Sequence, residues 1–324
     1  MRRPRRSGHS RWHLATLPQS RVSPCRGGEV SLICYEHPAP RVPLPSPDTP
    51  FVLAVAVTKG GTGKTTTSTA LAVELAKSGP VVLVDVDTQG QAAHALGVPA
   101  ADRGPGLAGV LSGTASAGEA LRRVRGEASG EGPLWLLAGS AALAAEAGKM
   151  ASDPAAGLLG VRDAVVAASR VAGANVVVID TPPGWGPLSL GSLAAADAVL
   201  SPLPPHALAV EALATFDRHL ATVQRTRAAF GGASLPRLAF VLPTMVAPRG
   251  TAPAMALEAI RGWAASHRDE PQVLAPVPRT VRVEESPAVG LAVTEHAPEH
   301  AAAAAYRKAA DAVRQIAGGR AASS

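Results

Sequence analysis

The sequence predicts an α/β fold with a doubly wound, mainly parallel β-sheet. Runs rich in Val, Leu and Ile alternate with alanine-rich segments from residue 51 onward. The apolar runs are continuous rather than alternating, which is typical of strands buried on both faces. The first run leads directly into a glycine-rich segment, and two later runs end in aspartate. Because ligands of such sheets bind beyond the carboxyl ends of the strands, we expect the functional site there.

The apolar runs predict seven strands, at Phe51–Val57, Val81–Val86, Leu134–Ala138, Asn175–Asp180, Ala198–Leu203, Leu238–Leu242 and Val273–Val277. The segments between them predict helices near 64–78, 155–171, 206–229, 251–268 and 298–316.

Composition excludes several classes of protein. The 324 residues allow one large domain or two small ones, and 47% hydrophobic residues suffice for a sizeable core. Only Cys25 and Cys34 are present, so the chain beyond residue 50 has no disulfide framework and no cysteine-based metal site. This scarcity of cysteine favours a reducing cytoplasm as the compartment. No uncharged apolar run reaches about 18 residues, so we expect no membrane-spanning helix.

Residues 1–50 differ from the rest of the chain. They carry eight arginines against three acidic residues, a net charge of +5, and therefore account for most of the chain's +6. Nine prolines leave no helical or strand period. We expect a disordered leader that is either a basic arm helping to hold DNA or an artefactual upstream extension. A folded domain is then expected over residues 51–317, followed by a flexible tail over 318–324.

The glycine-rich segment Thr58-Lys-Gly-Gly-Thr-Gly-Lys-Thr-Thr66 predicts a phosphate-binding loop. Its glycines let successive backbone N–H groups face phosphate oxygens, and the helix that follows adds its positive N-terminus. Lys64 supplies a charge for the β- and γ-phosphates, and the Thr65 hydroxyl suits Mg²⁺. The loop is a variant, because Thr58 stands where the usual pattern has glycine and Lys59 adds a second lysine.

This loop resembles the deviant Walker A motif of the ParA/MinD ATPases, a branch of the P-loop NTPases. The resemblance covers about residues 51–316 and implies ATP and Mg²⁺ as cofactors. It implies that Lys59 reaches the nucleotide of a partner across a dimer and that Lys64 acts in catalysis. The implied nucleotide contacts in the loop are Lys59, Gly60, Gly61, Thr62, Gly63, Lys64, Thr65 and Thr66.

Two acidic strand ends complete the resemblance. Asp85-Val-Asp87-Thr-Gln-Gly-Gln91 is similar to the first switch segment of ParA proteins, with Thr88 and Gln91 departing from its usual form. By that match Asp87 positions the attacking water and Asp85 supports the metal shell. The run ending in Asp180, followed by Thr-Pro-Pro-Gly184, resembles a Walker B strand and second switch. Asp180 would hold Mg²⁺ through water, and the stiff turn would sense the γ-phosphate.

The C-terminal half resembles the family in three further segments, Leu242–Arg249, Pro276–Pro287 and Glu295–Pro298 followed by Tyr306-Arg307. The match implies that Met245, Pro278 and Arg279 lie near the adenine base. It also places Arg249 and Arg282, with Arg279 as a less certain third, at DNA contacts.

The resemblance implies a cytoplasmic, nucleoid-associated ATPase that partitions chromosomes or plasmids. It would form an ATP-dependent homodimer, bind double-stranded DNA without sequence preference and respond to a ParB-like centromere-binding protein. A relative that positions another cargo on the nucleoid remains the alternative. A MinD-like membrane regulator is disfavoured, because residues 301–324 lack a strong apolar face. The iron–sulfur branch lacks cysteines, and the tyrosine-kinase branch lacks a tyrosine-rich tail.

Overall fold

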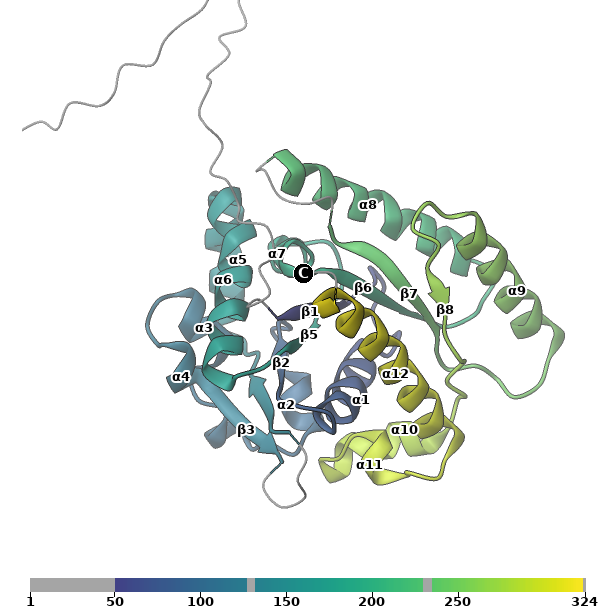
Figure 1. Ribbon diagram of the computed structural model, residues 1–324, viewed down its shortest axis with the longest axis horizontal. Helices are drawn as coiled ribbons and strands as arrows, with labels where there is room; N and C mark the ends of the chain where they lie inside the picture. Colours follow the sequence, from purple (N-terminus) through teal and green to yellow (C-terminus); the bar gives the residue numbers. More distant parts are fainter. Residues whose placement is uncertain (1–49, 127–131, 230–234, 323–324) are drawn as a thin grey trace, which may run out of the picture. The chain divides into compact units, whose positions relative to one another are not determined.

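The computed structural model describes residues 50–126, 132–229 and 235–322. These residues confirm the predicted α/β fold (Figure 1). Eight strands form one sheet in the order β3-β4-β2-β5-β1-β6-β7-β8, and every neighbouring pair except β3–β4 is parallel. Residues 1–49, almost all of the expected leader, lie outside the described part.

The strands are β1 (Phe51–Val55), β2 (Val81–Asp85), β3 (Leu121–Arg125), β4 (Leu134–Leu137), β5 (Val176–Asp180), β6 (Ala198–Leu203), β7 (Arg237–Pro243) and β8 (Gln272–Val273). The α-helices are α1 (Lys64–Ala76), α2 (Gln91–Ala95), α3 (Gly106–Leu111), α4 (Ala117–Ala120), α5 (Leu143–Ser152), α6 (Pro154–Ala172), α7 (Pro187–Ala195), α8 (Ala209–Ala229), α9 (Thr251–Ser266), α10 (Val281–Glu285), α11 (Val293–His296) and α12 (Ala301–Ala322). Two 3-10 turns, Ala100–Asp102 and Ser286–Val289, join them.

Helices cover both faces of the sheet, as the continuous apolar strands predict. Val52 and Ala54 of β1 pack with the helices on one side, chiefly α6, α7 and α8. Leu53 and Val55, the alternate residues of the same strand, pack with α1, α2 and α12 on the other. Because side chains alternate across a strand, an entirely apolar β1 supplies both halves of the core.

Two strands differ from the prediction, each for a local reason. The edge strand β3 was missed because its sequence, Leu-Arg-Arg-Val-Arg, lacks a continuous apolar run. The strand expected at Val273–Val277 is only two residues long, Gln272–Val273. Proline has no N–H to donate, so Pro276 interrupts the ladder.

The last helix also differs from the prediction. Helix α12 continues to Ala322, beyond the expected end at residue 316, and so includes residues 318–322 of the expected tail. Alanine has the strongest intrinsic helix propensity, and α12 as a whole is rich in it, although the extension contains Gly318 and Gly319.

Candidate active site

The three predicted strand ends meet in one row at the carboxyl edge of the sheet. In the parallel register Val55 of β1 pairs with Asp180 of β5, and Asp85 of β2 pairs with the same Asp180. The glycine-rich loop therefore begins beside both acidic strand ends. The sequence order alone did not give this register, although it predicted that the three ends share one edge.

The phosphate loop is shaped by glycine and tied to two other strand ends. Gly61 and Gly63 have φ of 70° and 90°, in the left-handed region that favours glycine. The Gly184 N–H donates to the Thr58 carbonyl at 3.0 Å, joining the loop to the turn after β5. The buried Thr244 hydroxyl, after β7, donates to the Thr62 carbonyl at 2.9 Å. These two hydrogen bonds tie the loop to the segments that follow β5 and β7.

The two loop lysines lie in different environments. Lys64 is only 7% exposed, and its Nζ donates to the Lys59 carbonyl at 3.2 Å. Burial lowers the pKa of Lys64, while the carboxylates of Asp180 and Asp87 oppose that shift. The Lys59 residue is exposed. Lys64 is therefore the lysine held among the acidic groups of the site, and Lys59 is accessible from outside.

Asp180 is the one acidic strand end with an oxygen left without a hydrogen bond. It is fully buried, and Oδ1 accepts a hydrogen bond from the Ser68 hydroxyl at 2.9 Å. Its Oδ2 has no partner among the described residues. Burial raises the pKa of Asp180 to about 6, against the lowering effect of Thr65, Ser68 and Lys64. A buried carboxylate oxygen without a partner fits a water molecule of a hydrated Mg²⁺.

The residues present suit Mg²⁺ held partly by phosphate and water. Among the described residues no group of three or more His, Cys, Asp or Glu side chains could hold a metal by itself. Mg²⁺ in nucleotide sites commonly takes one or two protein ligands together with phosphates and water. Thr65 and Asp180 therefore provide a sufficient set.

Asp85, the residue expected to support the metal shell, accepts hydrogen bonds from the backbone of its own loop. Its Oδ1 accepts the Asp87 N–H at 2.9 Å, and its Oδ2 accepts the Ala92 N–H at 3.0 Å. Burial, with the nearby Asp180, raises its pKa well above the usual value. Since both oxygens are bonded to backbone, Asp85 anchors the loop between β2 and α2.

Asp87 lies at the edge of the cavity that the loop encloses. Its Oδ1 accepts the Gln89 N–H at 2.9 Å, which fixes the turn. The cavity, about 650 Å³, is lined by Lys64, Thr65, Asp87, Pro183 and Met245, among other residues. This volume is within the usual range for small-molecule sites.

Sequence reasoning missed Gly139, which follows β4. A Cβ added there would lie 2.4 Å from the Asp87 carbonyl oxygen and 2.9 Å from the Asp85 Cγ. Gly90 is equally close, since its added Cβ would lie 2.6 Å from the Gly139 carbonyl oxygen. The available signal was a glycine directly after an apolar strand, which often marks a close backbone approach.

The predicted base-contacting residues come together through a short backbone ladder. Val246 forms a parallel bridge with Pro278, and the Arg279 N–H donates to the Val246 carbonyl at 2.9 Å. Met245, with φ of 53°, lines the cavity, whereas Pro278 and Arg279 are not among its lining residues.

The three predicted DNA-contacting arginines are all exposed. Arg249 precedes α9, and Arg279 and Arg282 flank the start of α10. Arg282 forms an exposed ion pair with Glu285 at 3.1 Å. Such pairs contribute about 0–1 kcal/mol, so this one leaves Arg282 available to another anion.

None of the helices in the described part of the chain could span a membrane.

Comparison with known proteins agrees with this geometry. A family model described as an AAA domain matches residues 51–230. The chain is 34% identical to the chromosome-partitioning ATPase Soj of Thermus thermophilus, over 81% of this chain and 94% of that protein. It is 33% identical to the chromosome partitioning protein ParA of Caulobacter vibrioides, over 80% and 92%. A solved cobyrinic acid a,c-diamide synthase from Mycobacterium smegmatis, with bound ADP and magnesium, superposes with a TM-score of 0.65 at 30% identity, over 82% of this chain and 94% of that one.

Proposed function

The chain belongs to the ParA/Soj family of chromosome-partitioning ATPases, and from this premise we propose an ATP-driven DNA-partitioning cycle for it. ATP closes a sandwich dimer, and the dimer binds double-stranded DNA without sequence preference. A ParB-like centromere-binding partner then triggers hydrolysis and release, which makes the protein nucleoid-associated. The observation that carries the proposal is that Lys64, Thr65 and Asp87 line one cavity, close to the buried Asp180.

In the proposed transfer of the γ-phosphoryl group to water, each residue of the site has a separate role. Lys64 would bind the β- and γ-phosphates, with the backbone N–H groups of Gly60–Thr66 around them. Thr65 and, through water, Asp180 would hold Mg²⁺, which supplies charge neutralisation on the phosphate oxygens when bound. Ser68 keeps the Asp180 carboxylate oriented. Asp87 would orient the attacking water, and Asp85 keeps the loop that carries Asp87 in place.

Two exposed groups of residues support the dimer and DNA parts of the proposal. Lys59 is exposed at the phosphate loop, where it could reach the nucleotide of a second copy. Arg249, Arg279 and Arg282 offer positive charge for DNA phosphates. We propose residues 51–317 as the ATPase unit, in which Met245, with Pro278 and Arg279, lies near the base.

The test is DNA binding by the full chain with ATP, with ADP and without nucleotide, on two unrelated duplexes. We expect tight binding to both duplexes with ATP only, together with a dimer on a sizing column. Lys59→Ala should bind ATP normally but lose the ATP-dependent dimer and, with it, DNA binding. Equal DNA binding in all three nucleotide states would contradict the proposal, and a Lys59→Ala dimer of normal stability would contradict the role of Lys59.

A further inference from the structure

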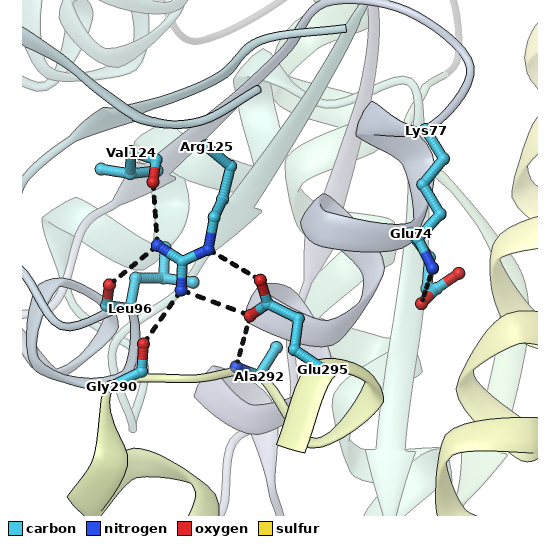
Figure 2. Close-up of polar contacts among 8 residues, drawn as sticks. All are labelled: Glu74, Lys77, Leu96, Val124, Arg125, Gly290, Ala292 and Glu295. Carbon is cyan, nitrogen blue, oxygen red and sulfur yellow. Dashed lines mark hydrogen bonds and ion pairs between the residues drawn. The ribbon is translucent and has the colours of Figure 1, made fainter. Parts of the chain in front are cut away.

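Arg125, at the end of the edge strand β3, joins three segments that are distant in sequence (Figure 2). Its Nε and Nη2 bind the Glu295 carboxylate at 2.7 and 3.3 Å. Nη2 also donates to the Gly290 carbonyl at 2.9 Å, and Nη1 donates to the carbonyls of Leu96 at 3.2 Å and Val124 at 2.8 Å. All five N–H donors of the guanidinium are thereby used. The Glu74–Lys77 pair in the same view joins only neighbouring turns of α1.

A β-bulge directs Arg125 toward these segments. The register of β3 on β4 shifts between Arg123 and Arg125. Regular alternation would send Val124 and Arg125 to opposite faces of the sheet. Instead Val124 packs in the core on the α1, α2 and α12 face, and Arg125 contacts the end of α2 on that same face. Bulges re-aim side chains in this way and are common beside functional sites.

The first segment that Arg125 holds leads directly to the active site. Leu96 follows α2, and α2 follows the loop that carries Asp87. The N-terminal end of α2 is bonded to Asp85 through the Ala92 N–H. A five-residue helix is thus fixed to Asp85 at one end and to Arg125 at the other. A displacement of α2 as a unit would carry the Leu96 carbonyl with it.

The other segment leads to the arginine surface, the exposed group formed by Arg249, Arg279 and Arg282. Gly290 ends a turn that begins directly after α10, the helix that carries Arg282. The turn is compact, because the Gly290 N–H donates to the Pro287 carbonyl and the Leu291 N–H donates to the Ser286 carbonyl. Gly97 and Gly290 touch through their backbones, since a Cβ added to Gly290 would lie 2.6 Å from the Gly97 Cα. The end of α2 therefore cannot shift without moving the turn after α10.

We propose that Arg125 is a positioning residue that couples the nucleotide-dependent loop between β2 and α2 to the DNA-contacting segment around α10. The coupling rests on the proposed function, because it requires both ATP and DNA to bind. It acts through Leu96 on one side and through Gly290 and Glu295 on the other. Arg125 contacts neither ligand.

The experiment compares wild type with Arg125→Met, which keeps the side-chain stem and removes every donor. In wild type the ratio of DNA affinities with ATP and with ADP measures the coupling. Allosteric coupling between two sites typically amounts to between about fivefold and 150-fold. In Arg125→Met we expect this ratio to fall at least about fivefold, while ATP affinity without DNA and ATP-dependent dimerisation stay within about twofold. By reciprocity, the factor by which DNA raises the preference for ATP over ADP should fall by the same amount.

Arg268→Met is the matched control. It also breaks a two-bond pair between distant segments, with Asp217 at 2.8 Å for both bonds, but that pair lies between α8 and the turn after α9. We expect its coupling ratio to equal that of wild type. Should Arg125→Met fail to fold, Arg125→Lys keeps the charge without the guanidinium fork and should lower the ratio partially.

Hydrogen exchange provides a readout that does not need DNA. In wild type the amides of residues 286–296 should be better protected with ATP than with ADP, and Arg125→Met should remove that difference. Identical protection in both nucleotide states of wild type would overturn the coupling, as would an unchanged DNA-affinity ratio in folded Arg125→Met. A wild type that shows the exchange difference but no ATP-dependent DNA binding would contradict the proposed function and leave the link between the two segments supported.

Discussion

The phosphate site and the arginine surface are built in opposite ways. Lys64 lies buried between a carbonyl and two carboxylates, whereas Arg249, Arg279 and Arg282 lie exposed on loops and a short helix. A buried charge interacts strongly, and removing its partner costs about 3–5 kcal/mol. Exposed charges contribute little individually and weaken as salt increases. Single substitutions should therefore abolish function at the first region and only lower affinity at the second.

The largest effect is expected for Lys64→Ala. The variant removes the one buried cation from the cavity, and the loss of a buried charge partner corresponds to at least about 100-fold weaker ATP binding. Calorimetric titration with Mg-ATP measures this. Lys308→Ala, an exposed lysine on α12, is the control and should bind ATP as wild type does. Tight ATP binding by folded Lys64→Ala would disprove the assignment of the phosphate site.

Asp87→Ala should stop hydrolysis without preventing ATP binding. Removing a group that positions the attacking water should lower phosphate release at saturating ATP by about 100-fold or more. The dimer should then persist with ATP on a sizing column. Asp87→Asn is a sharper variant, since its amide oxygen can still accept the Gln89 N–H and keep the turn. If both variants hydrolyse ATP at the wild-type rate, another residue positions the attacking water.

The contrast between the buried phosphate site and the exposed arginine surface also explains which residues the sequence could predict. Lys64, Asp85, Asp87 and Asp180 follow apolar runs, so local pattern was enough to place them at one edge of the sheet. The arginines came from family resemblance alone, because an exposed arginine carries no local signal.

Gly139 and Arg125 were missed because their roles depend on distant partners. A glycine directly after an apolar strand indicates a close backbone approach at Gly139, but it does not identify Asp85 as the partner. The bulge that turns Arg125 toward Glu295 has no signal in the local sequence. Likewise β3 was missed, because an arginine-rich edge strand lacks the apolar continuity of the central strands.

The arginine surface should respond in proportion to the number of charges removed. A dimer presents Arg249 and Arg282 twice each, and each neutralised phosphate contributes about −0.9 to the slope of log K against log salt. The double variant Arg249→Ala/Arg282→Ala should therefore flatten the slope by roughly 3.6 if all four touch phosphate. ATP binding and dimerisation should be unaffected, because neither residue lines the cavity.

A salt titration of DNA binding on two unrelated duplexes with ATP measures this slope. Wild type and the double variant carry the same basic residues 1–50, so that segment does not contribute to the difference between their slopes. We expect similar changes on both duplexes, since phosphate contacts carry no sequence information. An unchanged slope would place the DNA surface elsewhere, and a change on only one duplex would indicate base reading.

The smallest effect is expected where the two regions meet, at Thr244. Its buried hydroxyl holds the Thr62 carbonyl of the phosphate loop, and the ladder of Val246 with Pro278 and Arg279 begins two residues later. Thr244→Val keeps the shape but leaves that carbonyl without its donor, at a cost of about 1 kcal/mol, or roughly fivefold weaker ATP binding. Turnover of bound ATP should not change, because Thr244 does not line the cavity. Thr244→Ser, which retains the hydroxyl, should bind ATP within about twofold of wild type. If Thr244→Val and Thr244→Ser bind ATP equally well, the loop is held by its glycines and by Gly184 alone, and the contact with β7 has no part in nucleotide binding.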